Sequence, residues 1–192
     1  HRVQLLERLL PVYFELLQKL SSLGVEYVQF DEPCLSLDLT VVEREAISST
    51  YRKIAEKFPA LKVILANYFD CYGENLSTAL TLPVHVLHLD LVRCPSQLDD
   101  ILNAEKLNKD IVLSLGVVDG RNVWKNDFEN SLKSIQKTIN ALGKDNVWIA
   151  SSCSLLHSPH DLDLETNREN LPSEVKQWLA FARHKLDDIV KL

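Results

Sequence analysis

The sequence has 192 residues, 46% of them apolar, with a formal net charge of −6 at pH 7 and a pI near 5.5. This length can bury the core of one well-packed domain, and the negative charge argues against nucleic acid or an acidic membrane surface as the main partner, because both are polyanions. No secretory signal or membrane-spanning apolar run is seen, and the chain begins at His1 without any methionine, so we expect a cytoplasmic piece of something longer.

The first predicted elements are a helix and a short strand that ends in two acids. Apolar residues at mostly helical spacing predict a helix over residues 3–23, which Pro11 can kink and Gly24 ends. Residues 25–30 favour a buried strand that delivers Asp31 and Glu32 to its carboxyl end, where acids of parallel α/β folds usually face a pocket. The alternative is that Asp31 caps a turn and Glu32 is solvated.

The same order of strand, polar residue and helix recurs along the rest of the chain. Thr40 and Glu43 have the spacing of a capping box for a helix that runs to about Phe58. A long polar loop from His157 to Pro172 leads to a final amphipathic helix, and its length indicates a function or an interface. The other strands are expected at 61–69, 84–92, 111–119 and 147–155, with Asp70, Asp90, Asp119 and Cys153 at or near their ends, and the other helical segments at about 76–80, 95–107 and 128–142.

Five strands that each precede a helical segment predict an α/β fold, a partial TIM-type (β/α) barrel with five consecutive units of an eight-unit barrel. Five units cannot close such a barrel, so three more are expected before His1 or are absent. A doubly wound open sheet is the alternative, but no glycine-rich phosphate loop follows the first strand.

The strand-end residues are the candidates for a site at the mouth of this barrel. Clustered carboxylates need a cation or a donor between them, so Arg93 or Arg121 is expected as a counter-charge. The alternative is a salt-bridged structural rim. The candidates for substrate binding are Asp31, Glu32, Asp70, Asp90, Arg93, Asp119 and His157.

The four cysteines are widely spaced, without any CxxC pair. This pattern indicates a reducing compartment and single buried thiols. The cysteines are Cys34, Cys71, Cys94 and Cys153.

Five sequence blocks together resemble one family, the cobalamin-independent methionine synthases, and specifically the later part of their N-terminal barrel. The order and spacing of the blocks agree over essentially the whole chain. They are FDEP at 30–33, NYFD at 67–70, HLDLVR at 88–93, SLGVVDGRNVW at 114–124 and SSCSLLHSPHDLDLE at 151–165.

The resemblance implies a two-barrel enzyme that transfers a methyl group from 5-methyltetrahydropteroyltri-L-glutamate to L-homocysteine. In this family the companion C-terminal barrel is catalytic and holds zinc through a His-x-Cys pair, an acid and a later cysteine. Residues 1–192 are then one domain, whose partners are that barrel and, in the full enzyme, the methyl-folate polyglutamate and homocysteine.

The corresponding blocks of this chain depart from the zinc-binding pattern. Phe69 stands where the histidine is expected, which leaves Cys71, Asp90 and Cys153 as a degenerate remnant. We therefore expect no metal and no catalytic residue here, and a role in bracing the catalytic barrel and forming the surface for the folate tail.

Two other functions compete with this one. A free-standing barrel module that binds a folate or a thiol without catalysis is the first. A decarboxylase of the uroporphyrinogen type is weaker, because it needs an arginine-rich pocket for a polycarboxylate, which Arg93 and Arg121 alone hardly supply.

Overall fold

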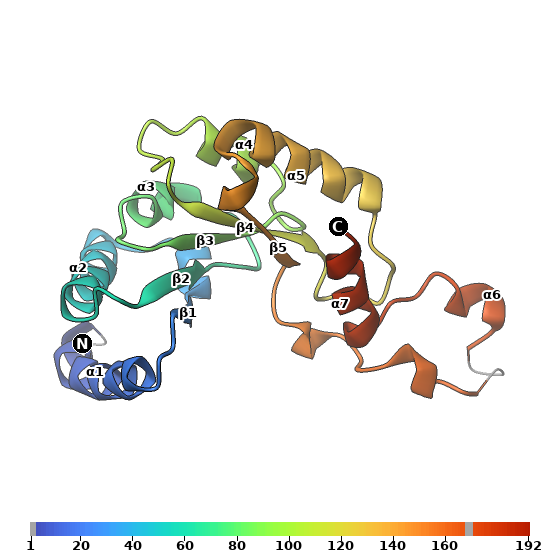
Figure 1. Cartoon of the computed structure of the whole chain (residues 1–192), viewed down its shortest axis with the longest axis horizontal. Helices are drawn as coiled ribbons and strands as arrows, with labels where there is room; N and C mark the ends of the chain where they lie inside the picture. Colours follow the sequence, from blue (N-terminus) through green and yellow to red (C-terminus); the bar gives the residue numbers. More distant parts are fainter. Residues whose placement is uncertain (1–2, 168–170) are drawn as a thin grey trace.

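A computed structural model describes residues 3–167 and 171–192 and contains one sheet of five parallel strands (Figure 1). The strands are hydrogen-bonded in the order β1-β2-β3-β4-β5, which confirms the five consecutive β-α units and differs from a doubly wound sheet, whose strand order reverses. In the part of the chain that the structure describes, β1 and β5 are edge strands, so the sheet does not close. The strands are β1 (Tyr27–Asp31), β2 (Lys62–Ala66), β3 (Val86–Asp90), β4 (Val112–Val118) and β5 (Val147–Ser151).

Seven α-helices among the described residues connect and flank these strands. None of them is long and apolar enough to cross a membrane. The helices are α1 (Leu6–Ser22), α2 (Val41–Lys57), α3 (Leu76–Ala79), α4 (Gln97–Leu102), α5 (Phe128–Leu142), α6 (Ser173–Lys176) and α7 (Ala182–Lys191). Short 3-10 turns lie at Val3–Leu5, Pro33–Ser36, Gly73–Asn75, Lys144–Asn146, Leu155–His157 and Leu162–Leu164.

The predicted capping signals operate at the helix ends. The Thr40 hydroxyl accepts a hydrogen bond from the Glu43 N–H at 3.3 Å, and the Glu43 carboxylate accepts one from the Thr40 N–H at 2.8 Å, which confirms the capping box. Helix α5 ends before Gly143, whose φ of 87° suits a glycine. Helix α1 continues through Pro11.

Two predicted helices differ from the structure. The helix expected over 95–107 is only α4, which ends at Leu102 with Asn103 as its C-cap. The final helix is two helices, because the segment between α6 and α7 forms an antiparallel bridge from Leu179 to Trp124 that interrupts helical bonding. The predicted loop over 157–172 begins at the end of the 3-10 turn Leu155–His157 and contains the 3-10 turn Leu162–Leu164, and its residues 168–170 lie outside the described residues.

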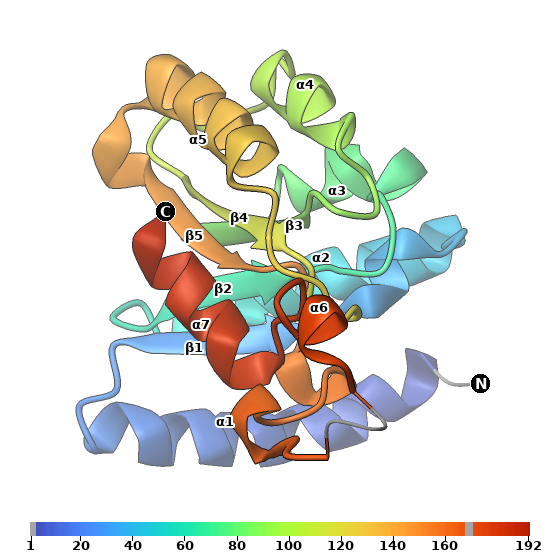
Figure 2. The same cartoon turned by 90° about the vertical axis from the view of Figure 1, so that its right-hand side faces the viewer.

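The two faces of the sheet differ in composition. Side chains on the helix-covered face, such as Leu65, Leu87 and Leu113, are fully buried in the main hydrophobic core. Helix α7 lies beside β5 and contributes to the same core (Figure 2). The opposite face is polar and carries His88 and Ser114 in register, so it is the face on which a site can form.

Candidate functional site

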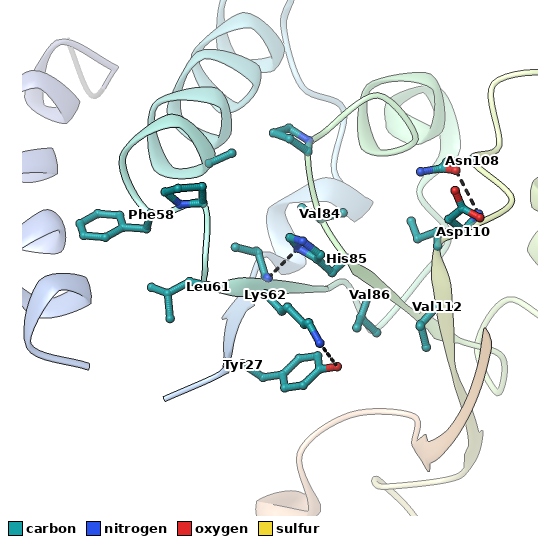
Figure 3. Close-up of a pocket in the computed structure, with 15 residues that line it drawn as sticks. Tyr27, Phe58, Leu61, Lys62, Val84, His85, Val86, Asn108, Asp110 and Val112 are labelled. Atoms are coloured by element: carbon teal, nitrogen blue, oxygen red, sulfur yellow. Dashed lines mark hydrogen bonds between the residues drawn. The ribbon is translucent and has the colours of Figure 1, made fainter. Parts of the chain in front are cut away.

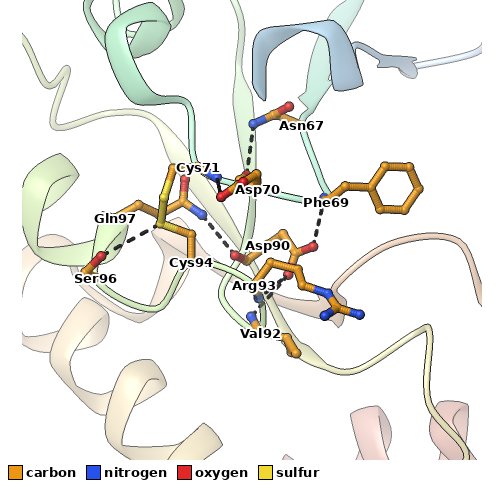
Figure 4. The surroundings of a disulfide bond; sticks show 10 residues. All are labelled: Asn67, Phe69, Asp70, Cys71, Asp90, Val92, Arg93, Cys94, Ser96 and Gln97. Carbon is orange, nitrogen blue, oxygen red and sulfur yellow. Dashed lines mark hydrogen bonds between the residues drawn. A yellow bond between two sulfur atoms is a disulfide. The ribbon is translucent and has the colours of Figure 1, made fainter. Parts of the chain in front are cut away.

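Asp90 is the last residue of β3 and is 1% exposed. One carboxylate oxygen accepts the Phe69 N–H at 2.9 Å, and the other accepts the N–H groups of Val92 at 3.1 Å and Arg93 at 2.9 Å (Figure 4). These bonds tie the loop after β2 to the loop after β3 and hold Phe69 at a φ of 81°, which non-glycine residues rarely adopt. The Asp90 carboxylate is thus committed to backbone donors.

Asp31 borders a cavity of about 260 Å³ on the polar face of the sheet. Its carboxylate accepts a hydrogen bond from Gln29 Nε2 at 2.7 Å. The pKa of Tyr68, on the same wall, is raised by burial and by the negative charge of Asp31. The cavity is lined by Gln29, Asp31, Ala66, Tyr68, His88, Ser114, Ala150, Ser151, Cys153 and Ser154.

His88 is a residue of this cavity that the sequence did not single out. Its Nδ1 lies 3.0 Å from the Ser114 hydroxyl and its Nε2 lies 3.2 Å from the carbonyl oxygen of Ser152. Burial lowers its pKa, so the imidazole is neutral at physiological pH. The signal that could have found it is the two-residue spacing to Asp90, which puts both on the same side of β3.

The hydrogen-bond partners of Glu32 lie outside that cavity, in α2 and in the turn after β1. Its carboxylate accepts hydrogen bonds from the Tyr51 hydroxyl at 3.0 Å and the Cys34 thiol at 3.5 Å. Burial and the Glu32 charge raise the pKa of Tyr51, and burial, followed by Glu32, raises the pKa of Cys34 to about 11. The adjacent acids Asp31 and Glu32 therefore do not act as one pair.

Two residues at the rim, Arg121 and His157, lie against the aromatic ring of Phe69. The Asp119 carboxylate accepts bonds from the Arg121 N–H at 2.7 Å and the Asn122 amide at 2.9 Å. The Arg121 guanidinium lies 4.8 Å from the centroid of the Phe69 ring, and the ring of His157 meets Phe69 edge-on at 5.7 Å.

The structure does not pair the acids with arginine as expected. Among the described residues, no salt bridge joins Arg93 or Arg121 to any of the acids at the strand ends. The prediction that one of these arginines pairs with the clustered acids is therefore wrong. The acids are Asp31, Glu32, Asp70, Asp90 and Asp119. Backbone and amide N–H groups supply the donors in its place at Asp90 and Asp119.

The structure also corrects the prediction that all four cysteines are single thiols. Cys71 and Cys94 form a disulfide with a Cα–Cα distance of 5.3 Å, so the expectation of four single thiols is wrong for these two. They are 23 residues apart in sequence, but the ends of the parallel neighbours β2 and β3 bring them together. Cys153 is buried, and burial raises its pKa.

The remnant set of Cys71, Asp90 and Cys153 is consequently not assembled in the described chain. Asp90 is saturated by N–H groups, and Cys71 is bonded to Cys94. The described residues contain two other clusters with metal-ligand atoms within 4.8 Å of one another: Asp70, Cys71 and Cys94, and Asp161, Asp163 and His184. In the second cluster, Arg183 already pairs with both carboxylates, at 2.7 and 3.3 Å.

A cavity of about 540 Å³ lies at the opposite, amino-terminal ends of the strands (Figure 3). Its polar groups are paired. Lys62 Nζ donates to Glu26 at 2.6 Å and to the Tyr27 hydroxyl at 3.3 Å, and His85 Nδ1 accepts the Val63 N–H at 3.1 Å. This end of a parallel barrel serves stability, so we do not place the site there.

Sequential parallel strands, an apolar helix-covered face and polar residues at the strand ends define part of a (β/α) barrel. Residues 1–143 match the family described as "Cobalamin-independent synthase, N-terminal domain". The chain belongs to this family, which confirms the resemblance seen in the sequence.

Two curated relatives are named 5-methyltetrahydropteroyltriglutamate–homocysteine methyltransferase. The one from Flavobacterium johnsoniae is 58% identical over 192 residues, and the one from Cytophaga hutchinsonii is 55% identical over the same length. Each alignment covers 100% of this chain and 25% of the relative, so the chain spans about a quarter of their length.

Two solved structures share the fold at 13% sequence identity. A B12-independent methionine synthase from a Shewanella species, in complex with selenomethionine, has a TM-score of 0.63 over 100% of this chain and 57% of that one. A putative vitamin-B12 independent methionine synthase from Listeria monocytogenes has a TM-score of 0.57 over 94% and 54%. At this identity they support the barrel architecture alone.

Proposed function

We propose that residues 1–192 form one domain, the later part of the N-terminal barrel of an enzyme that transfers a methyl group from 5-methyltetrahydropteroyltri-L-glutamate to L-homocysteine. The named relatives support this reaction. The segment itself is non-catalytic, and it works in the cytoplasm without nucleic acid or membrane partners.

The hydrogen bonding of the Asp90 carboxylate, which accepts three backbone N–H groups, is the observation that supports a non-catalytic role for this segment. Methyl transfer to homocysteine needs its thiol as a thiolate at neutral pH, and a metal cation supplies that activation in this family. The residues at the corresponding positions do not fit zinc, because Phe69 offers no ligand atom and Asp90 accepts three backbone N–H bonds. Zinc is therefore assigned to the companion C-terminal barrel.

Open surfaces support the bracing role. Both edge strands of the described sheet, β1 and β5, leave backbone groups available for pairing. Helix α1 and the 3-10 turn before it also present a row of exposed apolar side chains, at Leu5, Leu9, Val12, Tyr13 and Leu16. Such surfaces favour burial against further parts of a larger protein.

The patch of Phe69, Arg121 and His157 is the proposed contact for the folate tail. An exposed guanidinium held over an aromatic ring suits a carboxylate of a polyglutamate, because arginine binds carboxylates with paired donors.

The proposal is tested by assaying methyl transfer in the two-barrel protein and in residues 1–192 alone. Activity should require the two-barrel protein. In that protein, Arg121→Ala should raise KM for the triglutamyl folate and leave kcat nearly unchanged, because a tail contact binds substrate and transition state alike. Arg52→Ala on α2, also an exposed arginine, is the matched control. Turnover by the isolated segment would contradict the proposal.

The polar cavity beside Asp31 favours a second candidate, a binding module for a folate or a thiol that acts without the second barrel. Calorimetry of residues 1–192 with triglutamyl folate and with homocysteine separates the two. Tight binding that Asp31→Asn abolishes would favour the module.

A further inference from the structure

Lys185 of α7 is a buried lysine whose bonds all lead to one loop. Its side chain is 1% exposed, although lysines are almost never fully buried unless they are paired. Its ammonium donates hydrogen bonds to Oδ1 of Asn122 at 2.8 Å and to the carbonyl oxygen of Trp124 at 3.0 Å. Both acceptors are neutral and lie in the loop after β4, so the buried charge ties α7 to this loop.

Packing alone does not account for a lysine at this position. No salt bridge within residues 3–167 and 171–192 includes Lys185. Burial lowers its pKa, and the negative charges of Asp119 and Asp188 act in the opposite direction. An apolar side chain of similar volume often replaces a buried charge without loss of stability. We therefore look for the role of Lys185 in the geometry that it imposes on its two acceptors.

The hydrogen bonds of Lys185 continue through the loop to Arg121. The amide nitrogen of Asn122 donates to one oxygen of the Asp119 carboxylate at 2.9 Å. The other oxygen of Asp119 accepts the backbone N–H of Arg121 at 2.7 Å. Lys185 and Asp119 thus hold the two ends of the Asn122 amide, and Asp119 in turn fixes the backbone of Arg121.

The same network explains why Asp119 and Arg121 do not pair with each other. They carry opposite charges two residues apart, but no salt bridge joins them in the described part of the chain. Both oxygens of Asp119 already accept N–H groups, and the Asp119 charge also interacts with Lys185. The guanidinium of Arg121 therefore stays over the Phe69 ring, 4.8 Å from its centroid, instead of folding back onto Asp119.

A buried charged residue thus supports each half of the patch formed by Phe69 and Arg121. Asp90 holds Phe69 in the loop after β2, and Lys185 holds the loop that presents Arg121. We propose that Lys185 is a positioning residue for the folate tail, which keeps Arg121 over Phe69 and facing the tail without touching the substrate itself. This inference rests on the proposed contact between Arg121 and the tail.

A double-mutant cycle in the two-barrel protein separates a role through Arg121 from a purely structural one. Arg121→Ala should raise KM for the triglutamyl folate by about tenfold, because it removes charged hydrogen bonds. Lys185→Met should raise this KM by at least about threefold and leave kcat and the KM for homocysteine within about twofold, because only the tail contact is displaced. Adding Lys185→Met to Arg121→Ala should change KM by no more than about twofold, since both act on the same contact.

Two further variants control for a loss of folding, which circular dichroism measures in every protein of the series. Lys191→Met removes an exposed lysine of the same helix and should leave KM for the folate unchanged. Lys185→Gln keeps a hydrogen-bond donor at the buried position, and its KM should lie between those of the wild type and Lys185→Met.

The results distinguish failure of this inference from failure of the proposed function. If Arg121→Ala leaves KM unchanged, the tail contact is wrong, and the role of Lys185 is overturned with it. If Arg121→Ala raises KM but Lys185→Met does not, or if the two effects multiply, the positioning role alone is overturned. It is also overturned if Lys191→Met raises KM as much, or if neither Lys185→Met nor Lys185→Gln folds.

Discussion

The two faces of the five-stranded sheet have different roles: one packs the hydrophobic core and the other borders a polar cavity. On the helix-covered face, neighbouring strands place Leu65, Leu87 and Leu113 in one row, and each is fully buried. On the other face the row one residue further along contains Asp31, His88 and Ser114, which border a polar cavity. The apolar face supplies most of the folding free energy, because stabilisation by burial scales with the apolar area removed from water. The polar face is free to carry a site.

The largest effect is expected on the apolar face. Leu113→Ala removes a fully buried side chain from the centre of the sheet and should lower the free energy of unfolding by about 2–5 kcal/mol, through lost burial and the cavity left behind. Chemical denaturation measures this. Leu186→Ala, at an exposed leucine of α7, is the matched control and should change it by less than about 0.5 kcal/mol. Similar values for the two variants would break the distinction between core and surface.

Gly116 of β4 sharpens the comparison, because it is a polar-face position where packing still dominates. A Cβ there would lie 2.6 Å from the carbonyl oxygen of Leu89 and 2.9 Å from Cε1 of His88. Gly116→Ala should therefore cost about 1–3 kcal/mol of stability, measured by thermal or chemical unfolding. Adding His88→Ala should recover only part of this cost, since the clash with the backbone of Leu89 remains. Full recovery of the stability would contradict this, because it would show that the clash with the imidazole ring of His88 alone causes the loss in Gly116→Ala.

His88 should make stability depend on pH. Its pKa is lowered in the folded protein by burial, so below its unfolded pKa of about 6.5 the unfolded chain binds a proton that the folded chain does not. Stability should thus be fully present above about pH 6.5 and fall as the pH drops toward the folded pKa, with a slope of at most about 1.4 kcal/mol per pH unit. This pH dependence is measured by comparing the free energy of unfolding at about pH 7.5 and about pH 5.5. His88→Gln should remove this part of the slope, and His160→Gln, at an exposed histidine, should retain it.

The sequence was sufficient for the strands because they are short apolar runs, four of them with acids at or near their ends, and for α2 because Thr40 and Glu43 cap it. It was insufficient where the outcome depended on contacts between distant segments. The bridge from Leu179 to Trp124 splits the last helix, and the Cys71–Cys94 pair depends on the order of the strands. The direction of an acid is also a tertiary property, since Asp31 and Glu32 look alike in sequence but contact different layers.

The smallest stability effect is expected at Asp31, where the polar face meets solvent. Asp31→Asn should change the free energy of unfolding by less than about 0.5 kcal/mol, because the side chain is exposed and Gln29, which donates a hydrogen bond to it, is exposed too. The same change should lower the pKa of Tyr68, since the Asp31 charge contributes to raising it after burial. Tyrosinate absorbance, with Tyr68→Phe to identify the transition, measures this. Asp38→Asn, at an exposed aspartate in the loop before α2, should leave both quantities unchanged. A large loss of stability in Asp31→Asn would mean that the polar face, too, is built for folding.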